Sequence, residues 1–341
     1  MTGLAKLGGF PKFGLIDAPT PIQRLERLER AIGLGRGTRL WVKRDDLGLG
    51  GGGNKLRKLE YLLGEALAGG CDTFVTTGGI QSNHARLSAA ASARAGLACE
   101  LVLAHMVPRD DPEYRHGGNV LLDGLFGAAV HIVDGPDAWP AAERLAATLR
   151  AEGRRPYLVG AGGSSPVGCL GYAGCAAEIA AQEAEMDLGF ARIAVPNGSS
   201  GTHAGLAAGF AAMGMDPARV KSFTVLAPLD EARRATLDLA RRTLELLDEA
   251  ARIEAEGIAV AGEQRGEGYG IPTSAMLEAV RLMARTEGLL LDPVYSGKAF
   301  AGFLADSRSG EEGDLLYVMT GGTPGLFAYR SEFERSGSGE E

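Results

Sequence analysis

The feature that most constrains the fold is a regular alternation between short β-rich runs and longer helical stretches, which begins near Leu40. The β-rich runs lie at residues 40–43, 73–77, 100–104, 130–133, 157–159, 193–196, 222–227 and 315–319. The helical stretches lie near residues 55–68, 83–95, 119–126, 139–150, 169–185, 201–213, 231–254, 274–285 and 298–306. This alternation is typical of an α/β protein whose parallel sheets carry helices on both faces. Ligands of such sheets bind beyond the carboxyl ends of the strands, so the loops after the strands are the informative ones.

Length and composition narrow the class further. A chain of 341 residues with 45% apolar residues is expected to fold into two domains. The net charge of −8 argues against nucleic acid and anionic membranes as partners. The sequence shows neither a signal peptide nor an apolar run long enough to span a bilayer, so we expect a cytoplasmic protein. The four cysteines show no CxxC spacing, which predicts free thiols and no metal site.

The first informative loop is RDDLGLGGGGNKLRKLEY, which follows the strand at 40–43. We expect Asn54 to cap the next helix and Lys55 to occupy its first turn. The helix dipole, the cations Arg57 and Lys58, and desolvation would all lower the pKa of the Lys55 ammonium. A neutral lysine is a nucleophile suited to an aldehyde, although a solvated surface lysine is the alternative. The string is not a P-loop, because Asn54 separates the glycines from Lys55 and no hydroxyl residue follows.

Two further loops offer backbone NH groups and small polar side chains. GGIQSNH follows the strand at 73–77, and its Ser82 and Asn83 would cap a helix whose N-terminus suits a carboxylate, unless this is an ordinary capped helix. His84 next to them is more simply a core or solvated residue. NGSSGTHAGL follows the strand at 193–196 and would form a good phosphate cradle, unless it is a plain tight turn. LDPVYSGKAF and TGGTPGLFAY near the C-terminus add weaker candidates, Tyr295, Ser296, Thr320 and Thr323.

Taken together, these strings resemble the fold-type II pyridoxal 5′-phosphate (PLP) enzymes, which have the tryptophan synthase β-like fold. The resemblance is to the branch that contains D-cysteine desulfhydrase and 1-aminocyclopropane-1-carboxylate (ACC) deaminase. It is carried by KRDD, GGNKLRKLEY, GGIQSNH, GNVLLD, GSSGTHAGL, LDPVYSGKA and TGGTPGLFAY, which occur in family order from Lys43 to Tyr329. It therefore covers nearly the whole chain and implies PLP as the cofactor and a small amino acid as the substrate.

The resemblance also implies the role of each site residue. Lys55 would form the Schiff base with the cofactor and transfer the proton, with Ser82 and Tyr295 as further catalytic residues. The cofactor would be bound by Lys55, Lys58, Asn83, Asn197, Gly198, Ser199, Ser200, Gly201, Thr202, Ser296 and Thr320. The substrate would be bound by Ser82, Asn83, His84, Tyr269 and Tyr295.

Two departures from the ACC deaminase pattern indicate the substrate. ACC deaminases carry Glu after the DPVY tyrosine and Leu before the last GG pair, whereas this chain has Ser296 and Thr320. A hydroxyl donor leaves the pyridine nitrogen unprotonated, which weakens the cofactor as an electron sink. β-Elimination of a thiolate tolerates the weaker sink, so the resemblance favours conversion of D-cysteine to pyruvate, ammonia and hydrogen sulfide.

Several alternatives stay open. L-Cysteate sulfo-lyases have similar motifs and release sulfite; their sulfonate substrate would favour extra cations, for which Arg115 and His116 are candidates. ACC deaminase activity is the next alternative. A non-catalytic protein that binds an amino acid or PLP is an alternative from a different functional class. The family implies a small domain at 56–163, a large domain at 1–55 and 164–330, a flexible tail at 331–341, and a homodimer.

Overall fold

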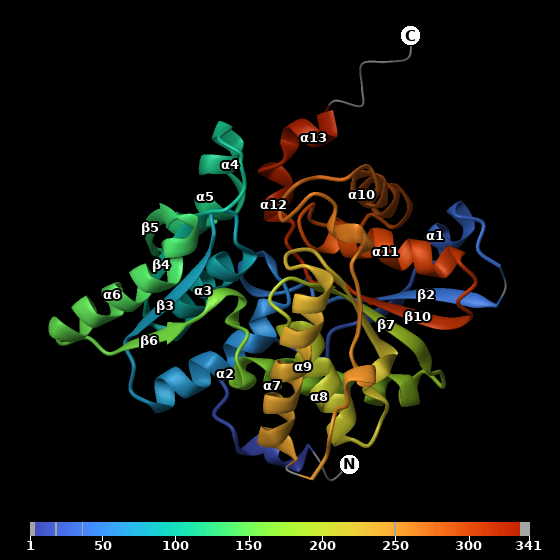
Figure 1. Cartoon of the computed structure of the whole chain (residues 1–341), viewed down its shortest axis with the longest axis horizontal. Coiled ribbons are helices and arrows are strands. Elements are labelled where there is room, and N and C mark those ends of the chain that lie inside the picture. The colour runs from blue at the N-terminus through green and yellow to red at the C-terminus, as the bar shows by residue number, and fades with distance from the viewer. Residues whose placement is uncertain (1–3, 18, 36, 249, 335–341) are drawn as a thin grey trace.

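The computed structural model describes residues 4–17, 19–35, 37–248 and 250–334, and it contains two sheets that lie side by side (Figure 1). The larger sheet has the strand order β1-β2-β10-β7-β8-β9, and all its pairs are parallel except β1 with β2. Its strands are β1 Ile22–Arg24, β2 Thr38–Lys43, β7 Phe190–Asn197, β8 Val220–Thr224, β9 Ala259–Ala261 and β10 Gly313–Val318. The smaller sheet is wholly parallel, with the order β5-β4-β3-β6. Its strands are β3 Thr73–Gly79, β4 Ala98–His105, β5 Ala129–Asp134 and β6 Pro156–Val159. The predicted α/β class with parallel sheets is confirmed.

Helices cover both faces of the larger sheet because its central strands are apolar on both sides. In β10, Leu315 and Tyr317 face one cluster of buried side chains, and Leu316 and Val318 face another. The first cluster lies under α1 Glu26–Ala31, α10 Ser274–Glu287 and α11 Ser296–Arg308. The second lies under α7 Pro166–Glu185 and α8 Gly201–Ala212, and α9 Leu229–Leu247 packs outside them (Figure 1).

The smaller sheet is covered in the same way. In β4, Leu101 and Leu103 pack against α3 Asn83–Ala95, whereas Val102 packs against α6 Ala138–Ala151 on the other face. The short helices α4 Pro112–His116 and α5 Gly118–Leu125 follow β4, and α12 Pro324–Phe327 and α13 Arg330–Glu334 end the described chain. Single-turn 3-10 helices occupy Ala5–Gly9, Leu49–Gly51, Gly135–Asp137, Ala161–Gly163, Pro217–Arg219, Ala255–Gly257 and Glu263–Arg265.

Helix α2 (Lys55–Ala68) joins the two halves of the molecule. Its leucines pack on Phe74 of the smaller sheet, and its opposite side packs on α7 of the larger half. The approach to α7 is so close that a Cβ at Gly171 would lie 1.9 Å from the Arg57 carbonyl oxygen. Only glycine fits there without moving one helix. Because Lys55 is the first residue of α2, the α2–α7 contact fixes the backbone position from which the Lys55 side chain extends.

The predicted elements match the structure with a few corrections. Helices α2 and α3 begin at the predicted residues, whereas the helix predicted over 231–254 ends at Leu247. There the chain turns back, and Ile253 and Ile258 are buried against α9, so packing overrides the continued helical pattern. The three-residue strands β1 and β9 were not predicted. A flexible tail was predicted for residues 331–341. Residues 331–334 belong to helix α13, and residues 335–341 lie outside the described chain.

The two sheets agree with the domain boundaries that the family resemblance implies. Strands β3 to β6, which form the smaller sheet, lie within residues 56–163, and the strands of the larger sheet lie outside this range. The division into two domains itself stays a prediction. All four cysteines are free, as expected. Among the described residues, no cluster of side chains is suited to a metal ion, and no helix is both long and apolar enough to cross a membrane.

An isolated buried carboxylate in α5 gives a testable pH dependence. Asp123 is fully buried, and neither of its oxygens has a hydrogen-bond partner within the described chain. Burial raises the pKa of Asp123 to about 8, although the nearby Arg86 charge opposes this. Between the unfolded pKa near 4 and the folded pKa, the folded protein keeps a proton that the unfolded chain releases. The stability contributed by this site therefore falls as pH rises through that window.

We expect Asp123→Asn to stabilise the protein relative to wild type, and the gain to grow by about 3 kcal/mol between about pH 5.5 and 8. The asparagine has nearly the same shape but cannot ionise, so the pH-dependent cost disappears. Urea unfolding at both pH values measures the difference. Asp238→Asn is the matched control, because Asp238 is largely exposed and its substitution should give no pH-dependent gain. A gain for Asp123→Asn that does not change with pH would refute the assignment.

Candidate active site

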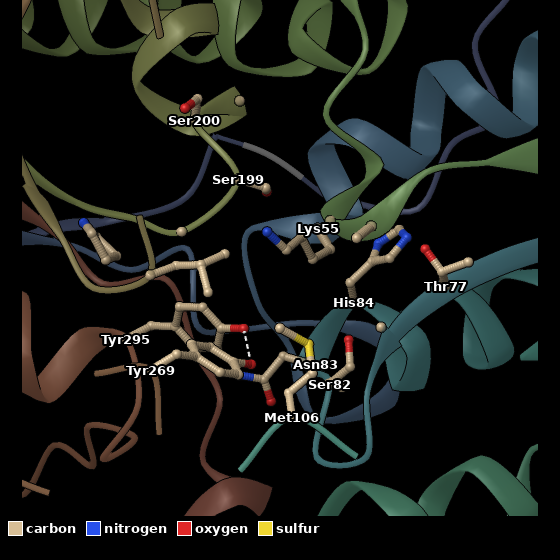
Figure 2. A pocket seen from close by; sticks show the side chains of 18 of the residues that line it. Lys55, Thr77, Ser82, Asn83, His84, Met106, Ser199, Ser200, Tyr269 and Tyr295 are labelled. Atoms are coloured by element: carbon tan, nitrogen blue, oxygen red, sulfur yellow. Dashed lines mark hydrogen bonds between the residues drawn. The ribbon is translucent and has the colours of Figure 1, made fainter. Parts of the chain in front are cut away.

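A pocket lies between the two halves of the molecule, at the ends of strands from both sheets (Figure 2). Its walls come from loops that are far apart in the chain. The pocket is lined by Asn54, Lys55, Thr77, Gly78, Gly79, Ser82, Asn83, His84, Ala104, Met106, Gly135, Ala138, Ala161, Gly162, Pro196, Gly198, Ser199, Ser200, Gly201, Thr202, Leu226, Tyr269, Tyr295 and Thr320. The site residues predicted from sequence therefore converge here, except for Lys58, Asn197, Ser296 and the weaker candidate Thr323.

Lys55 projects into the middle of this pocket from the start of α2 (Figure 2). Burial lowers the pKa of the Lys55 ammonium well below its ordinary value, and the adjacent Lys58 lowers it further through its charge and a hydrogen bond. Both causes disfavour the charged form of the amine. Lys55 therefore loses its proton more readily than an ordinary lysine, as a nucleophile or base requires.

The loop before Lys55 needs its glycines. Gly48 and Gly50–Gly53 all have positive φ, a region that other residues rarely adopt. A Cβ at Gly52 would also lie 1.8 Å from the Asp46 carbonyl oxygen. The buried Arg86 of α3 holds this loop by donating to the carbonyl oxygens of Gly50 and Gly52. The loop is thus tied to the helix that presents Asn83 to the same pocket.

Asn54 does not cap α2, which corrects the expectation from sequence. Its side chain makes no capping bond, and Nδ2 instead donates to Thr202 Oγ1 at 2.9 Å. The backbone NH of Asn54 donates to the Thr320 carbonyl oxygen. Asn54 therefore connects the start of α2 with the first turn of α8 and with the loop after β10.

The loop between β7 and α8 forms the predicted anion cradle. Ser200 has φ of 65°, an uncommon backbone conformation for a residue other than glycine, and its NH donates to Asn197 Oδ1 at 3.2 Å. The NH groups at the N-terminus of α8 then line the pocket beside Ser199 and Thr202. A Cβ at Gly201 would lie 2.5 Å from both Lys58 Nζ and Ser164 Oγ, so a larger residue there would displace these two side chains. Such a helix N-terminus favours a phosphate.

Lys58 and Asn197 support the cradle from behind and do not line the pocket. Lys58 Nζ donates to Ser164 Oγ at 2.8 Å and to the Gly162 carbonyl oxygen at 3.1 Å. Ser164 Oγ is in turn 2.8 Å from Ser199 Oγ. Burial lowers the pKa of Lys58 to about 8. Asn197 Nδ2 donates to Ser222 and Thr236, so this side chain organises the turn rather than contacting a ligand.

The N-terminus of α3 forms the opposite wall. Ser82 caps the helix, as predicted, because its Oγ accepts from the Ala85 NH at 3.1 Å. Asn83 lines the pocket, and its Oδ1 is buried with no hydrogen-bond partner in the described chain. An unsatisfied buried amide oxygen is costly, so Asn83 is disposed to receive a ligand donor.

His84 next to Asn83 is neutral, and its hydrogen bonds define its tautomer. Thr76 Oγ1 donates to the Val159 carbonyl oxygen at 2.9 Å, so it accepts from His84 Nε2 at 2.8 Å. His84 Nδ1 is then a buried acceptor with no partner among the described residues. Burial lowers the pKa of His84 well below its ordinary value, and the charges of Lys55 and Lys58 add to this effect.

Two tyrosines close the side opposite His84. The hydroxyls of Tyr269 and Tyr295 lie 2.5 Å apart, and the rings meet edge to face with centroids 5.7 Å apart (Figure 2). Burial raises the pKa of both hydroxyls. Both therefore stay protonated at neutral pH and are able to donate hydrogen bonds.

Ser296 does not line the pocket, and its expected contact with the cofactor ring stays a prediction. It is fully buried, and its hydroxyl donates to Asp292 Oδ1 at 2.6 Å. The hydroxyl proton of Ser296 is thus donated within the turn that precedes α11. Thr320 lines the pocket and is left as the candidate hydroxyl for the ring nitrogen.

Sequence reasoning missed some residues that shape the pocket. No sequence motif indicated Arg86 or Asp292, because their roles depend on the residues that the fold brings next to them. Ser164 follows the strand at 156–159 in the string GAGGSS, the same kind of glycine- and hydroxyl-rich loop that identified the other site segments. Met106, which lines the outer part of the pocket and is half-exposed, carries no motif.

Comparison with known proteins agrees with this geometry. Residues 15–321 match the family model "Pyridoxal-phosphate dependent enzyme", and the chain belongs to this family. It is 38% identical to D-cysteine desulfhydrase of Serratia proteamaculans over 96% of this chain and 98% of the relative. It is also 42% identical to 1-aminocyclopropane-1-carboxylate deaminase of Burkholderia ambifaria, over 95% of this chain and 98% of the relative.

Solved structures give the same result. The crystal structure of an ACC deaminase homologue superimposes with a TM-score of 0.87 at 36% identity, covering 97% of this chain and 98% of that one. A crystal structure of threonine deaminase shares the fold, with a TM-score of 0.61 at 22% identity, over 89% of this chain and 92% of that chain. The predicted family, fold type and cofactor are therefore confirmed.

The residues present fit PLP on structural grounds. The turn at Ser199–Thr202, at the N-terminus of α8, suits the phosphate, and the amine of Lys55 suits the aldehyde. The unpartnered Oδ1 of Asn83 marks a third point at which a ligand completes the site, as judged from the described residues. Lys55, Asn83, Ser199–Thr202 and Thr320 would hold the cofactor.

Proposed function

We propose that the chain catalyses PLP-dependent β-elimination on a small β-substituted amino acid, and that D-cysteine is converted to pyruvate, ammonia and hydrogen sulfide. The observation that carries the proposal is Lys55, an amine with a lowered pKa, opposite a capped helix N-terminus and a pair of tyrosine hydroxyls. Bound PLP would supply the electron sink for the carbanion character at Cα. Sequence relatives named D-cysteine desulfhydrase support this choice.

Each wall of the pocket has a task in this proposal. The NH groups at the start of α3, with Ser82 and Asn83, bind the substrate carboxylate. Lys55 Nζ accepts the Cα proton, because its lowered pKa favours the unprotonated amine that a base needs. Tyr295, supported by Tyr269, donates a hydrogen bond to the departing sulfur.

The distribution of cations favours a thiol over a sulfonate. Lys55 is the only lysine or arginine among the described lining residues, and it has its own role. Arg115 is bonded to Asp110, and neither it nor His116 lines the pocket. The second anion of L-cysteate would therefore lack a partner, and L-cysteate sulfo-lyase is the weaker proposal. Ring opening of ACC is weaker still, because neither Ser296 nor Thr320 is a carboxylate.

A product assay tests the proposal. The purified protein with PLP is given D-cysteine, L-cysteine, β-chloro-D-alanine, L-cysteate and ACC, and pyruvate, 2-oxobutanoate, sulfide and sulfite are measured. We expect pyruvate and sulfide in equal amounts from D-cysteine. Sulfite from L-cysteate, or 2-oxobutanoate from ACC, as the faster reaction would reject D-cysteine as the substrate. An absorbance band of bound PLP that no amino acid changes would indicate a non-catalytic binding protein instead.

The assembly and location belong to the same proposal. A homodimer in the cytoplasm is proposed on the family resemblance, and sedimentation of the purified protein together with cell fractionation tests both parts.

A further inference from the structure

Lys298 is a buried lysine that the proposed chemistry does not use. It lies in the first turn of α11, three residues after Tyr295, and its side chain is fully buried. Its Nζ donates to the carbonyl oxygens of Arg265 at 2.7 Å and Gly268 at 2.8 Å. No carboxylate of the described chain lies within ion-pair distance of it. Burial, followed by the nearby Arg265 charge, lowers the pKa of Lys298 to about 8.

The other buried lysines have an evident purpose, and Lys298 differs from them. Lys43 is neutralised by Glu178 at 2.6 Å, and Lys58 supports the phosphate cradle. A buried ammonium with only neutral partners is costly, because carbonyl dipoles replace its hydration incompletely. Since a methionine would fill the same space without this cost, the two bonds to the backbone are the property that distinguishes lysine here.

The segment that Lys298 holds is irregular and has few bonds of its own. It connects β9 to α10, and Gly266 and Gly270 within it have positive φ. Its own backbone bonds run from the Arg265 NH to Gly262 at 3.2 Å and from the Ile271 NH to Gly268 at 3.3 Å. The Tyr329 hydroxyl holds the far end through the Gly270 carbonyl oxygen at 2.9 Å. Side chains from elsewhere therefore fix the shape of this segment.

Tyr269 is the residue placed by these bonds. It directly follows Gly268, whose carbonyl oxygen accepts from Lys298, and it directly precedes Gly270. Its hydroxyl then reaches Tyr295, which stands at the start of the same helix that carries Lys298. One helix thus presents Tyr295 to the pocket and, through Lys298, sets the position of the tyrosine that bonds to it.

We propose that Lys298 is a positioning residue that fixes Tyr269 against Tyr295 by holding the Arg265 and Gly268 carbonyl oxygens. The role of Tyr269 beside the substrate rests on the proposed function, whereas the positioning of Tyr269 by Lys298 does not. The bonded ammonium keeps the 265–268 segment in one conformation, so the Tyr269 hydroxyl stays within hydrogen-bond distance of Tyr295.

The test compares Lys298→Met, Tyr269→Phe and the double variant. Displacing a positioned group by about 1 Å costs about 10²-fold in rate, so Lys298→Met should lower kcat/KM for D-cysteine by about 10²-fold. If Lys298 acts through Tyr269, adding Lys298→Met to Tyr269→Phe should lower kcat/KM little further. The absorbance of bound PLP should not change, because Lys55 and the cradle are untouched. Lys221→Met is the matched control, since Lys221 contacts α11 near its other end through Asp306 and should leave kcat/KM unchanged.

A second readout does not depend on turnover. Amide hydrogen exchange in residues 265–270 should become faster in Lys298→Met but not in Lys221→Met, while exchange in α2 and α8 stays the same. Multiplicative losses in the double variant, or unchanged exchange in this segment, would overturn the inference. If wild-type protein releases no pyruvate from any substrate, the proposed function fails, and the exchange comparison still decides the role of Lys298.

Discussion

Replacing Lys55 with alanine should lower kcat/KM for β-elimination from D-cysteine by at least about 10⁴-fold. The same amine is proposed to hold the cofactor aldehyde and to accept the Cα proton, so one substitution removes both tasks. No other lysine of the described chain lines the pocket to replace it. The fold should be retained, because the Lys55 side chain is directed into the pocket rather than packed in the core (Figure 2).

Pyruvate formation measures the loss, and thermal unfolding confirms that the variant is folded. Lys221→Ala serves as the control, because this lysine pairs with Asp306 away from the pocket and its removal should preserve activity. Retention of more than about 1% of wild-type kcat/KM by Lys55→Ala would show that another group removes the proton.

The largest expected effect on stability is that of Gly171→Ala in α7. A Cβ there would lie 1.9 Å from the backbone carbonyl oxygen of Arg57 and 3.0 Å from the backbone nitrogen of Lys58, both in α2. Backbone atoms cannot rotate away as a side chain can, so the two helices must separate. We expect the free energy of unfolding to fall by about 3 kcal/mol or more. Because α2 carries Lys55 and Lys58, the affinity for PLP should fall with it.

Gly174→Ala in the same helix is the matched control. Its Cβ would meet only the end of the Leu7 side chain, at 3.4 Å. Alanine favours a helix by about 1 kcal/mol over glycine, so this variant should be as stable as wild type or more so. Chemical unfolding of both variants gives the comparison. Equal stabilities for Gly171→Ala and Gly174→Ala would mean that the α2–α7 contact is looser than the structure shows.

Much of the site followed from local sequence signals. The glycine run before Lys55 and the capping serine at position 82 mark the starts of α2 and α3 in the sequence, although Arg86 also holds the glycine loop in the fold. The NGSSGT turn is likewise recognisable from its own small residues and Asn197, although Ser164, Ser222 and Thr236 also bond to it in the fold. Each signal is local because backbone conformation and helix capping depend on neighbours in the chain.

The errors occurred where other residues compete for the same polar group. Asn54 has the residue type of a helix cap, but Thr202 at the other wall of the pocket takes its amide. The Ser296 hydroxyl bonds to the carboxylate of Asp292, which the sequence did not indicate, and its contact with the cofactor stays a prediction. Arg86 resembles a surface arginine in the sequence, yet it is buried against the glycine loop. These pairings do not follow from residue type alone, so the fold was needed to find them.

The attachment of the cofactor to Lys55 can be measured directly. Protein carrying PLP is reduced with borohydride, which makes the covalent link permanent, and is then digested and mapped by mass spectrometry. The structure predicts that the added mass of the reduced cofactor lies on Lys55. A label on Lys58 or any other lysine, or protein that binds PLP but gains no mass, would contradict the role of Lys55 as the lysine that binds the cofactor aldehyde.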